Sequence, residues 1–204
     1  YCLLSSGAAL GFGCGPLVVA RRHLSQEECA NGVVAIPGEE TTANLLLTLT
    51  RQFHGERKAM LFSDVIPAVA EGKTDLGVII HEGRFTYEQY GLVKILDLGA
   101  WWEETFHLPL PLGAIVVRRD IPYETARAMQ TAIGESVSYA WQHPDASRGY
   151  IREHAQELED AVISAHIETF VTKFSYDLGE EGRRAITELV AASAKMRGRE
   201  LPEA

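Results

Sequence analysis

Residues 75–87 read DLGVIIHEGRFTY and decide the fold. Residues 76–80 are an unbroken apolar run rich in β-branched side chains, which is typical of a parallel strand covered by helices on both faces. His81 follows the run directly, so we expect it at the carboxyl end of that strand, where open α/β sheets bind their ligands. Gly83 is expected to let the backbone turn there.

Strand and helix patterns alternate on both sides of this stretch. Strands are predicted at residues 32–36, 59–62 and 93–96, and helices at residues 41–53 and 65–71. The helix at residues 41–53 places Leu45, Leu46, Leu49 and Phe53 on one apolar face at helical spacing. Such alternation is the signature of a doubly wound α/β lobe.

We interpret two further β-branched segments, residues 17–20 and 114–117, as a pair of strands that cross between two lobes. Between them, residues 97–107 are predicted to be a surface segment. Residues 108–111 (LPLP) are predicted to be irregular, because proline lacks a backbone donor and restricts the residue before it. Everything after Pro122 has helical periodicity.

We therefore expect a two-lobed α/β chain. Residues 1–21 and 114–204 are assigned to lobe I, and residues 22–113 to lobe II. The helices after Pro122 have little sheet to cover, so lobe I is predicted to be incomplete at its N-terminal side.

Composition excludes several classes of function. The 204 residues carry a net charge of -9 and show no basic stripe, which argues against binding to nucleic acid. No apolar run is long enough to cross a bilayer, and no signal peptide is recognisable. The three cysteines are odd in number and lack metal-ligand spacing. We interpret them as free thiols and expect a cytoplasmic protein.

His81 is the candidate catalytic residue, because the unperturbed pKa of imidazole suits proton transfer near neutrality. The alternative is a histidine that is merely hydrogen-bonded at a strand end. Thr41 and Thr42 open a predicted helix, where exposed N–H groups and two hydroxyls could accept a carboxylate or a polar ring substituent. Ordinary helix capping explains the pair equally well, and the two roles are compatible.

Three further residues are candidate substrate contacts. Ser6 follows a short strand predicted at residues 1–5 and could face a cleft between the lobes, although a plain turn is the simpler interpretation. Arg84 could bind a carboxylate bidentately or form a surface ion pair, and Gly83 lies in the same loop. The remaining histidines have no ligand spacing, so no metal site is predicted. The G-x-S-x-G motif of serine hydrolases is absent.

Several long segments resemble one enzyme family. They are residues 35–43 (AIPGEETTA), 77–87 (GVIIHEGRFTY), 97–102 (DLGAWW) and 108–119 (LPLPLGAIVVRR), together with the opening SSGAALGFGCGPLVVAR at residues 5–21. In this order they resemble the 1,4-dihydroxy-6-naphthoate synthases of the futalosine route to menaquinone. The likeness extends over nearly the whole chain, with the C-terminal helices matching only in general pattern.

The resemblance implies a fold like that of type 2 periplasmic binding proteins, with two α/β lobes around a cleft. It implies a carbon–carbon lyase that converts cyclic dehypoxanthine futalosine, a small carboxylated substrate, without metal or organic cofactor. The family's general base falls on His81, and its substrate-binding threonine pair falls on Thr41 and Thr42. The family's opening strands and helices, with a further substrate-binding loop, have no counterpart before Tyr1.

Other functions of the same fold remain open from sequence. One is a chorismate dehydratase-like enzyme, although the HEGRFTY and TTAN segments fit it less well. A non-catalytic solute-binding protein is another, and the effector domain of a transcription regulator is a third. The sequence does not indicate an oligomeric state.

Overall fold

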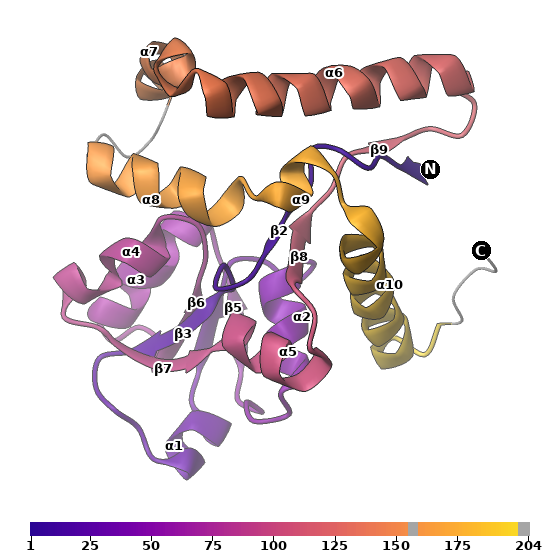
Figure 1. Cartoon of the computed structure of the whole chain (residues 1–204). Coiled ribbons are helices and arrows are strands. Elements are labelled where there is room, and N and C mark those ends of the chain that lie inside the picture. The colour runs from indigo at the N-terminus through magenta and orange to yellow at the C-terminus, as the bar shows by residue number, and fades with distance from the viewer. Residues whose placement is uncertain (155–158, 200–204) are drawn as a thin grey trace. The chain divides into compact units, whose positions relative to one another are not determined.

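A computed structural model describes residues 1–154 and 159–199 (Figure 1). The chain divides into two compact units. Unit 1 comprises residues 1–14 and 108–204, and unit 2 is the continuous stretch Gly15–His107. The chain thus passes from one unit to the other after Cys14 and again after His107.

Unit 2 is a doubly wound α/β unit. Its elements in chain order are β3 (Leu17–Ala20), α1 (Gln26–Asn31), β4 (Val34–Ile36), α2 (Thr42–Leu49), β5 (Arg57–Ala59), α3 (Phe62–Ala70), β6 (Leu76–Ile79), α4 (Gly83–Thr86), the 3₁₀ turn η1 (Tyr87–Tyr90), β7 (Val93–Asp97) and α5 (Leu98–Phe106). The strands form one five-stranded sheet in the order β5-β4-β6-β3-β7. β3 runs antiparallel to both of its neighbours, whereas β4 pairs in parallel with β5 and β6.

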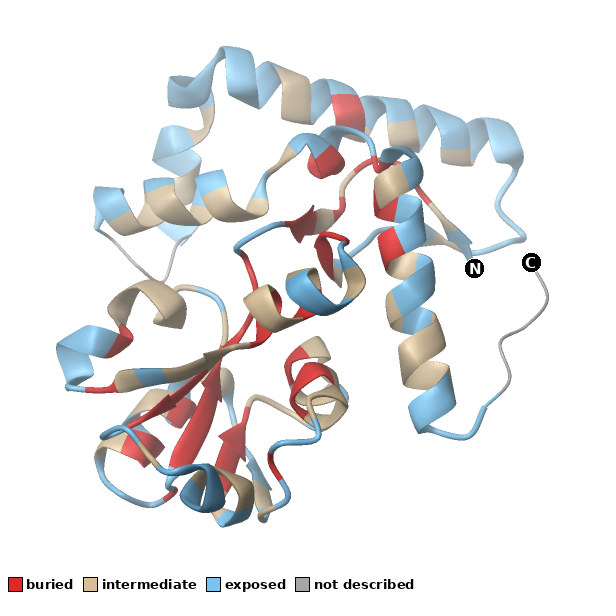
Figure 2. Ribbon diagram, turned by 60° about the horizontal axis from the view of Figure 1, so that its bottom comes forward, coloured by how far each residue is buried: buried red, intermediate tan, exposed pale blue. Residues whose placement is uncertain are grey.

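Helices cover both faces of this sheet, and buried residues concentrate on its central strands (Figure 2). On one face, Val65 and Val69 of α3 pack against alternate residues of β3, β4 and β6. Gly77 permits this close packing, because a Cβ there would lie 2.6 Å from a methyl of Val69. α2 and α5 contact the sheet as well as each other, and the side chain of Trp102 in α5 is fully buried. The apolar run 76–80 therefore fits a strand buried on both sides, as expected.

Unit 1 combines two short strand pairs with helices. Its elements are β1 (Cys2–Leu3), β2 (Ala9–Gly11), β8 (Leu110–Gly113), β9 (Val116–Val117), α6 (Tyr123–Gln142), α7 (Pro144–His154), α8 (Asp160–Phe170), α9 (Lys173–Tyr176) and α10 (Gly179–Met196). β1 pairs antiparallel with β9, and β2 with β8. The helices expected after Pro122 are confirmed, although residues 155–158, which the helical pattern included, lie outside the described residues.

Two strand predictions were wrong. Residues 17–20 do not pair with residues 114–117, because β3 lies between β6 and β7 in the sheet of unit 2 while β9 pairs with β1. The segment 110–113 is a strand despite Pro111, which stands opposite Leu10 in the register. Proline is tolerated there because β8 has a single strand neighbour, so one side of the strand needs no donor.

Two boundaries also differ from the prediction. Residues 97–107 were expected to be a surface segment, but Leu98–Phe106 is a helix whose residue Trp102 is buried. The strand expected at residues 59–62 is β5, Arg57–Ala59, and Phe62 already begins α3. Unit 2 also begins and ends earlier than the predicted lobe at residues 22–113. It begins earlier because β3 joins its sheet, and it ends earlier because β8 pairs with β2 of unit 1.

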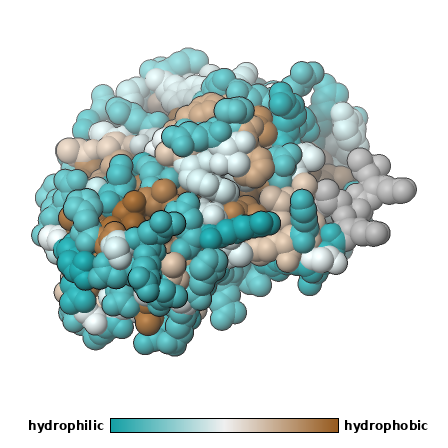
Figure 3. All heavy atoms as spheres, turned by 90° about the horizontal axis from the view of Figure 1, so that it is seen from below, coloured by the Kyte–Doolittle hydropathy of each residue, from teal (hydrophilic) through white to brown (hydrophobic). Residues whose placement is uncertain are grey.

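Hydrophilic residues cover most of the face drawn in Figure 3, with apolar patches between them. Among residues 1–154 and 159–199, none of the helices has the length and apolar character of a membrane span. No disulfide joins Cys2, Cys14 or Cys29, all of which are described.

Candidate functional site

The candidate site is built on the carboxyl edge of the sheet in unit 2. β6 and β7 each run antiparallel to β3, so they are parallel to each other, and β4 and β5 share their direction. The carboxyl ends of these strands therefore meet at one edge, together with the start of β3 at Leu17. In open α/β sheets this is the edge at which ligands bind.

His81 follows β6 at this edge with an exposed side chain. Its backbone φ of 56° lies in the left-handed region, which a residue with a side chain seldom adopts. The turn after the strand is therefore made by His81 itself. Gly83, which we expected to supply it, has no positive φ and begins α4 instead.

The imidazole of His81 is held from one side by an aromatic ring. Phe62, the first residue of α3, meets it edge to face, with ring centroids 5.2 Å apart and an interplanar angle of 71°. This is one of the arrangements that aromatic pairs prefer. The ring contact limits the orientations of an otherwise exposed side chain.

Thr41 and Thr42 follow β4, the strand beside β6 in the sheet. Thr41 is the N-cap of α2: its hydroxyl accepts from the Asn44 N–H at 3.2 Å and donates to the Gly38 carbonyl at 2.8 Å. Thr42 is the first helical residue and is half-buried. In the part of the chain that the structure describes, its hydroxyl has no hydrogen-bond partner. Thr41 therefore has a capping role, and Thr42 is the better placed of the two to bind a ligand.

Arg84 lies in α4 and points inward. Its guanidinium donates to the Gly15 carbonyl and to Oδ2 of Asp97, the latter at 3.3 Å. The two charged side chains are only 14% and 18% exposed. Of the two roles expected for Arg84, an ion pair is observed, although it is largely buried instead of superficial.

Ser6 belongs to unit 1. It is buried, and its hydroxyl lies beside Gly134 of α6. Unit 2 thus brings five of the predicted residues, namely His81, Gly83, Arg84, Thr41 and Thr42, to one sheet edge, while Ser6 comes from the other unit.

Sequence reasoning missed two residues of this edge. Phe62 was assigned to a strand, so its position opposite His81 could not be anticipated. Asp97 was placed in a surface segment, although an aspartate that directly precedes Leu-Gly and an aromatic pair is a recognisable N-cap signal. Its Oδ1 accepts from the N–H groups of Gly99 and Ala100, each at 3.0 Å.

Two cavities lie away from these residues. One of about 350 Å³ in unit 2 is lined by residues of α1, of the segment after α2 and of β7. Another of about 400 Å³ in unit 1 lies among α6, α7 and α8. Across residues 1–154 and 159–199, no group of three or more His, Cys, Asp or Glu side chains is arranged to hold a metal ion.

Comparison with known proteins identifies the family. A family model described as menaquinone biosynthesis matches residues 1–195. The 1,4-dihydroxy-6-naphthoate synthase of Thermus thermophilus is 50% identical over 202 residues, covering 99% of this chain and 73% of that protein. The chain belongs to the 1,4-dihydroxy-6-naphthoate synthase family. The enzyme of the same name from Streptomyces coelicolor is 44% identical over 199 residues, and the chain covers 70% of it.

Solved structures agree with the expected fold. Protein AF1704 from Archaeoglobus fulgidus superposes with a TM-score of 0.87 at 36% identity, covering 96% of this chain and 72% of that one. The sulphonate-binding protein SsuA from Escherichia coli superposes with a TM-score of 0.62 at 14% identity, covering 97% and 71%. The predicted fold, an α/β fold like that of periplasmic solute-binding proteins, is therefore confirmed. So is the predicted membership of an enzyme family of menaquinone biosynthesis.

Proposed function

We propose that this member of the 1,4-dihydroxy-6-naphthoate synthase family converts cyclic dehypoxanthine futalosine to 1,4-dihydroxy-6-naphthoate, as a carbon–carbon lyase. The observation that carries the proposal is the 50% identity with the Thermus thermophilus enzyme of that name, which extends over 99% of this chain. The substrate is a small carboxylated molecule. No organic cofactor or metal enters the proposed reaction.

His81 is proposed as the general base. Its support is positional: it is an exposed imidazole at the carboxyl end of β6, steadied by the ring of Phe62. Removal of a substrate proton by His81 would trigger fragmentation of the ribose-derived part, and formation of the aromatic naphthalene ring would drive the reaction. General-base action typically contributes about 10²–10⁴-fold in rate.

Thr42, with Thr41, is proposed to hold a polar end of the substrate at the N-terminus of α2. The exposed N–H groups of a helix N-terminus favour a carboxylate. Ser6 and Gly83 are retained as proposed substrate contacts from the sequence. For Arg84 the buried ion pair supports a different role, which is developed below.

The decisive experiment measures products by mass spectrometry after incubation with cyclic dehypoxanthine futalosine and, separately, with chorismate. Formation of 1,4-dihydroxy-6-naphthoate from the first substrate supports the proposal. Dehydration of chorismate would support the rival enzyme, and binding without any product would support a solute-binding protein.

The general base is tested by His81→Asn. Asparagine tolerates a positive φ better than most residues but cannot accept the proton, so backbone strain does not confound the result. We expect a fall in kcat of at least about 100-fold with substrate binding preserved. His107→Asn is the matched control, because His107 is also exposed and has φ 54°. Near-normal turnover by the His81 variant would refute the assignment.

The cytoplasmic location predicted from the sequence remains a prediction. It is supported by the three cysteines, none of which is in a disulfide. Fractionation of cells that express the tagged chain tests it.

A further inference from the structure

We propose that Arg84 and Asp97 act as a positioning pair that fixes the turn carrying His81, instead of binding substrate. The inference rests on the proposed role of His81 as the base. It concerns how unit 2 keeps that residue in an unfavourable backbone conformation.

The pair joins three segments at the carboxyl edge of the sheet. Arg84 extends from the short helix α4 after β6 and donates to the Gly15 carbonyl, just before β3. It also donates to Asp97 at the end of β7. In the sheet, Leu17 stands opposite both Ile79 and Asp97, so the pair spans three adjacent strands.

Asp97 is itself fixed by its other oxygen. Oδ1 accepts from two N–H groups of the first turn of α5, which leaves Oδ2 for Arg84. The Leu98 N–H donates to the Pro16 carbonyl at 2.9 Å, which ties the start of α5 to the same segment as Gly15. Gly99 lies so close to Gly15 that a Cβ on it would approach the Gly15 Cα to 2.7 Å. The anchor for Arg84 is therefore rigid.

His81 depends on this anchor because only two residues separate it from Arg84. The Arg84 N–H points toward the His81 carbonyl at 3.4 Å, a long hydrogen bond. A left-handed residue that is not glycine persists only where its surroundings over-determine it. Downstream, α4 is a single turn, which the buried guanidinium of Arg84 and the buried ring of Tyr87 attach to the unit. On the other side, Phe62 contacts the ring.

The charge arrangement also favours positioning over substrate binding. Arg84 is only 14% exposed, and its two terminal nitrogens each already have a protein acceptor. To bind a substrate carboxylate it would have to leave Asp97, and an unpaired carboxylate would then stay behind in a mostly buried position, which is costly.

The test uses Arg84→Met, Arg84→Lys and Asp97→Asn in the full chain. Small misplacements of a catalytic group cost up to about 100-fold in rate. We therefore expect Arg84→Met to lower kcat about 10- to 100-fold with KM changed by less than about threefold. Asp97→Asn keeps an oxygen for the cap of α5 and should give a smaller loss, and Arg84→Lys should recover part of the turnover.

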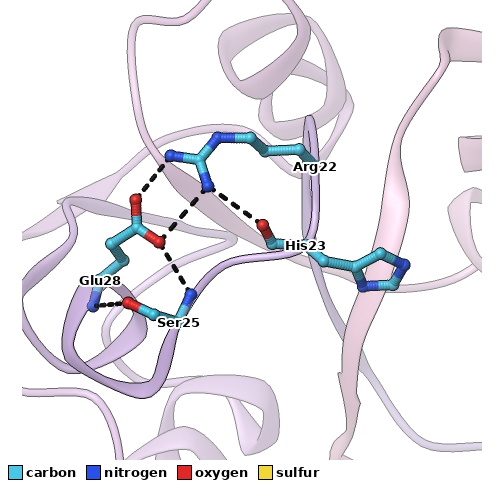
Figure 4. Close-up of polar contacts among 4 residues, drawn as sticks. All are labelled: Arg22, His23, Ser25 and Glu28. Atoms are coloured by element: carbon cyan, nitrogen blue, oxygen red, sulfur yellow. Dashed lines mark hydrogen bonds and ion pairs between the residues drawn. The ribbon is translucent and has the colours of Figure 1, made fainter.

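Arg22→Met is the matched control. Arg22 also forms an ion pair in unit 2, with Glu28, but it is 65% exposed and follows the opposite end of β3 (Figure 4). This variant should have normal kcat and KM. A loss equal to that of Arg84→Met would show that any broken ion pair disturbs the unit, and would overturn the proposal.

A double-mutant cycle separates positioning from direct action. If Arg84 works through His81, then Arg84→Met added to His81→Asn causes little further loss in kcat. Losses that multiply, or a large rise in KM in the single variant, would mean that Arg84 contacts the substrate and would overturn the inference. Full turnover by the His81→Asn variant alone would instead show that His81 is not the general base.

A readout without turnover completes the test. The imidazole signal of His81 in a ¹H–¹³C NMR spectrum, assigned by its loss in His81→Asn, should shift and broaden in Arg84→Met. The signal of His107 should not change. An unaltered His81 signal would overturn the proposal whatever the activity of the chain.

Discussion

The ring of Phe62 meets the imidazole of His81 edge to face, with centroids 5.2 Å apart. The contact joins the first residue of α3 to the turn after β6, the strand that follows α3 in the chain. It gives the proposed base a defined orientation although its side chain is exposed, and it leads to the first prediction.

Phe62→Leu should lower kcat about two- to tenfold, because aromatic pairs contribute about 0.5–1.5 kcal/mol beyond area burial. The measurement is steady-state turnover together with the melting temperature. Phe106→Leu is the control, since Phe106 is the last residue of α5 and its ring stacks on Trp102, with centroids 4.1 Å apart. Equal turnover of Phe62→Leu and wild type would contradict the prediction.

Gly99→Ala should destabilise the chain by about 1–3 kcal/mol, the usual cost of forced overpacking. A Cβ at this position would lie 2.7 Å from the Cα of Gly15, and backbone cannot move aside as a flexible side chain can. Denaturant unfolding measures the change. Gly149→Ala is the control, because nothing lies within 4 Å of its added Cβ in α7 and alanine favours a helix. A neutral Gly99→Ala would disprove the close approach.

Trp102→Ala should cost about 3–5 kcal/mol of unfolding free energy, because Trp102 is fully buried in unit 2. Trp101, the half-buried neighbour in the same helix, is the control, and its replacement by alanine should cost clearly less. Comparable losses for the two variants would mean that α5 does not pack as described.

Glu28 should contribute stability that depends on pH and salt. Its hydrogen bond from Arg22, followed by the one from the Ser25 backbone, lowers the pKa of its carboxyl to about 2 (Figure 4). Because the folded pKa is depressed, the contribution is fully present above the ordinary carboxyl pKa near 4.5 and is lost as pH falls toward about 2.

The melting temperatures of wild type and Glu28→Gln test this. The melting temperature of wild type should exceed that of Glu28→Gln only slightly, since the ion pair is exposed. The difference should become smaller as the pH falls from 6 to 3, or when the salt concentration is raised to about 1 M. Glu27→Gln, which removes another carboxylate from the same helix turn, is the control for the change in net charge. A difference that widens on acidification would contradict the expected sign.

The cysteines should differ in reactivity toward a thiol reagent. Cys2 is exposed, whereas partial burial and then the charge of Glu28 raise the pKa of the Cys29 thiol. A raised pKa leaves less thiolate, which is the reactive form. Mass spectrometry of timed alkylation should therefore show Cys2 modified before Cys29, with buried Cys14 slowest. Modification of Cys29 first would overturn this order.

Sequence reasoning located the parts of the fold that follow local rules. The buried run ending at Ile80 and the capped helix after Thr41 are both in the structure, because apolar periodicity and capping residues act over a few neighbouring positions. The predicted pairing of residues 17–20 was wrong, because a short apolar run does not specify which strands it pairs with. No strand was predicted at Pro111, because the sequence does not reveal that β8 has a neighbouring strand on one side only. Backbone N–H donors are therefore needed on that side alone.

The site was predicted in part for the same reason. A histidine directly after an apolar strand marks the sheet edge, so the position of His81 at that edge was predicted. That His81 also adopts φ 56°, that Phe62 faces it and that Asp97 ties down Arg84 depend on contacts between segments distant in sequence. Nothing local to residues 81–84 distinguishes an arginine that binds a ligand from one that anchors a turn.

The left-handed backbone at position 81 has an evolutionary consequence. Asparagine is one of the few residues that suits this conformation, and a single base change converts a histidine codon to an asparagine codon. On the proposed assignment, one nucleotide change therefore separates the enzyme from a paralogue that folds and binds its substrate without converting it. Such a paralogue would behave as a solute-binding protein.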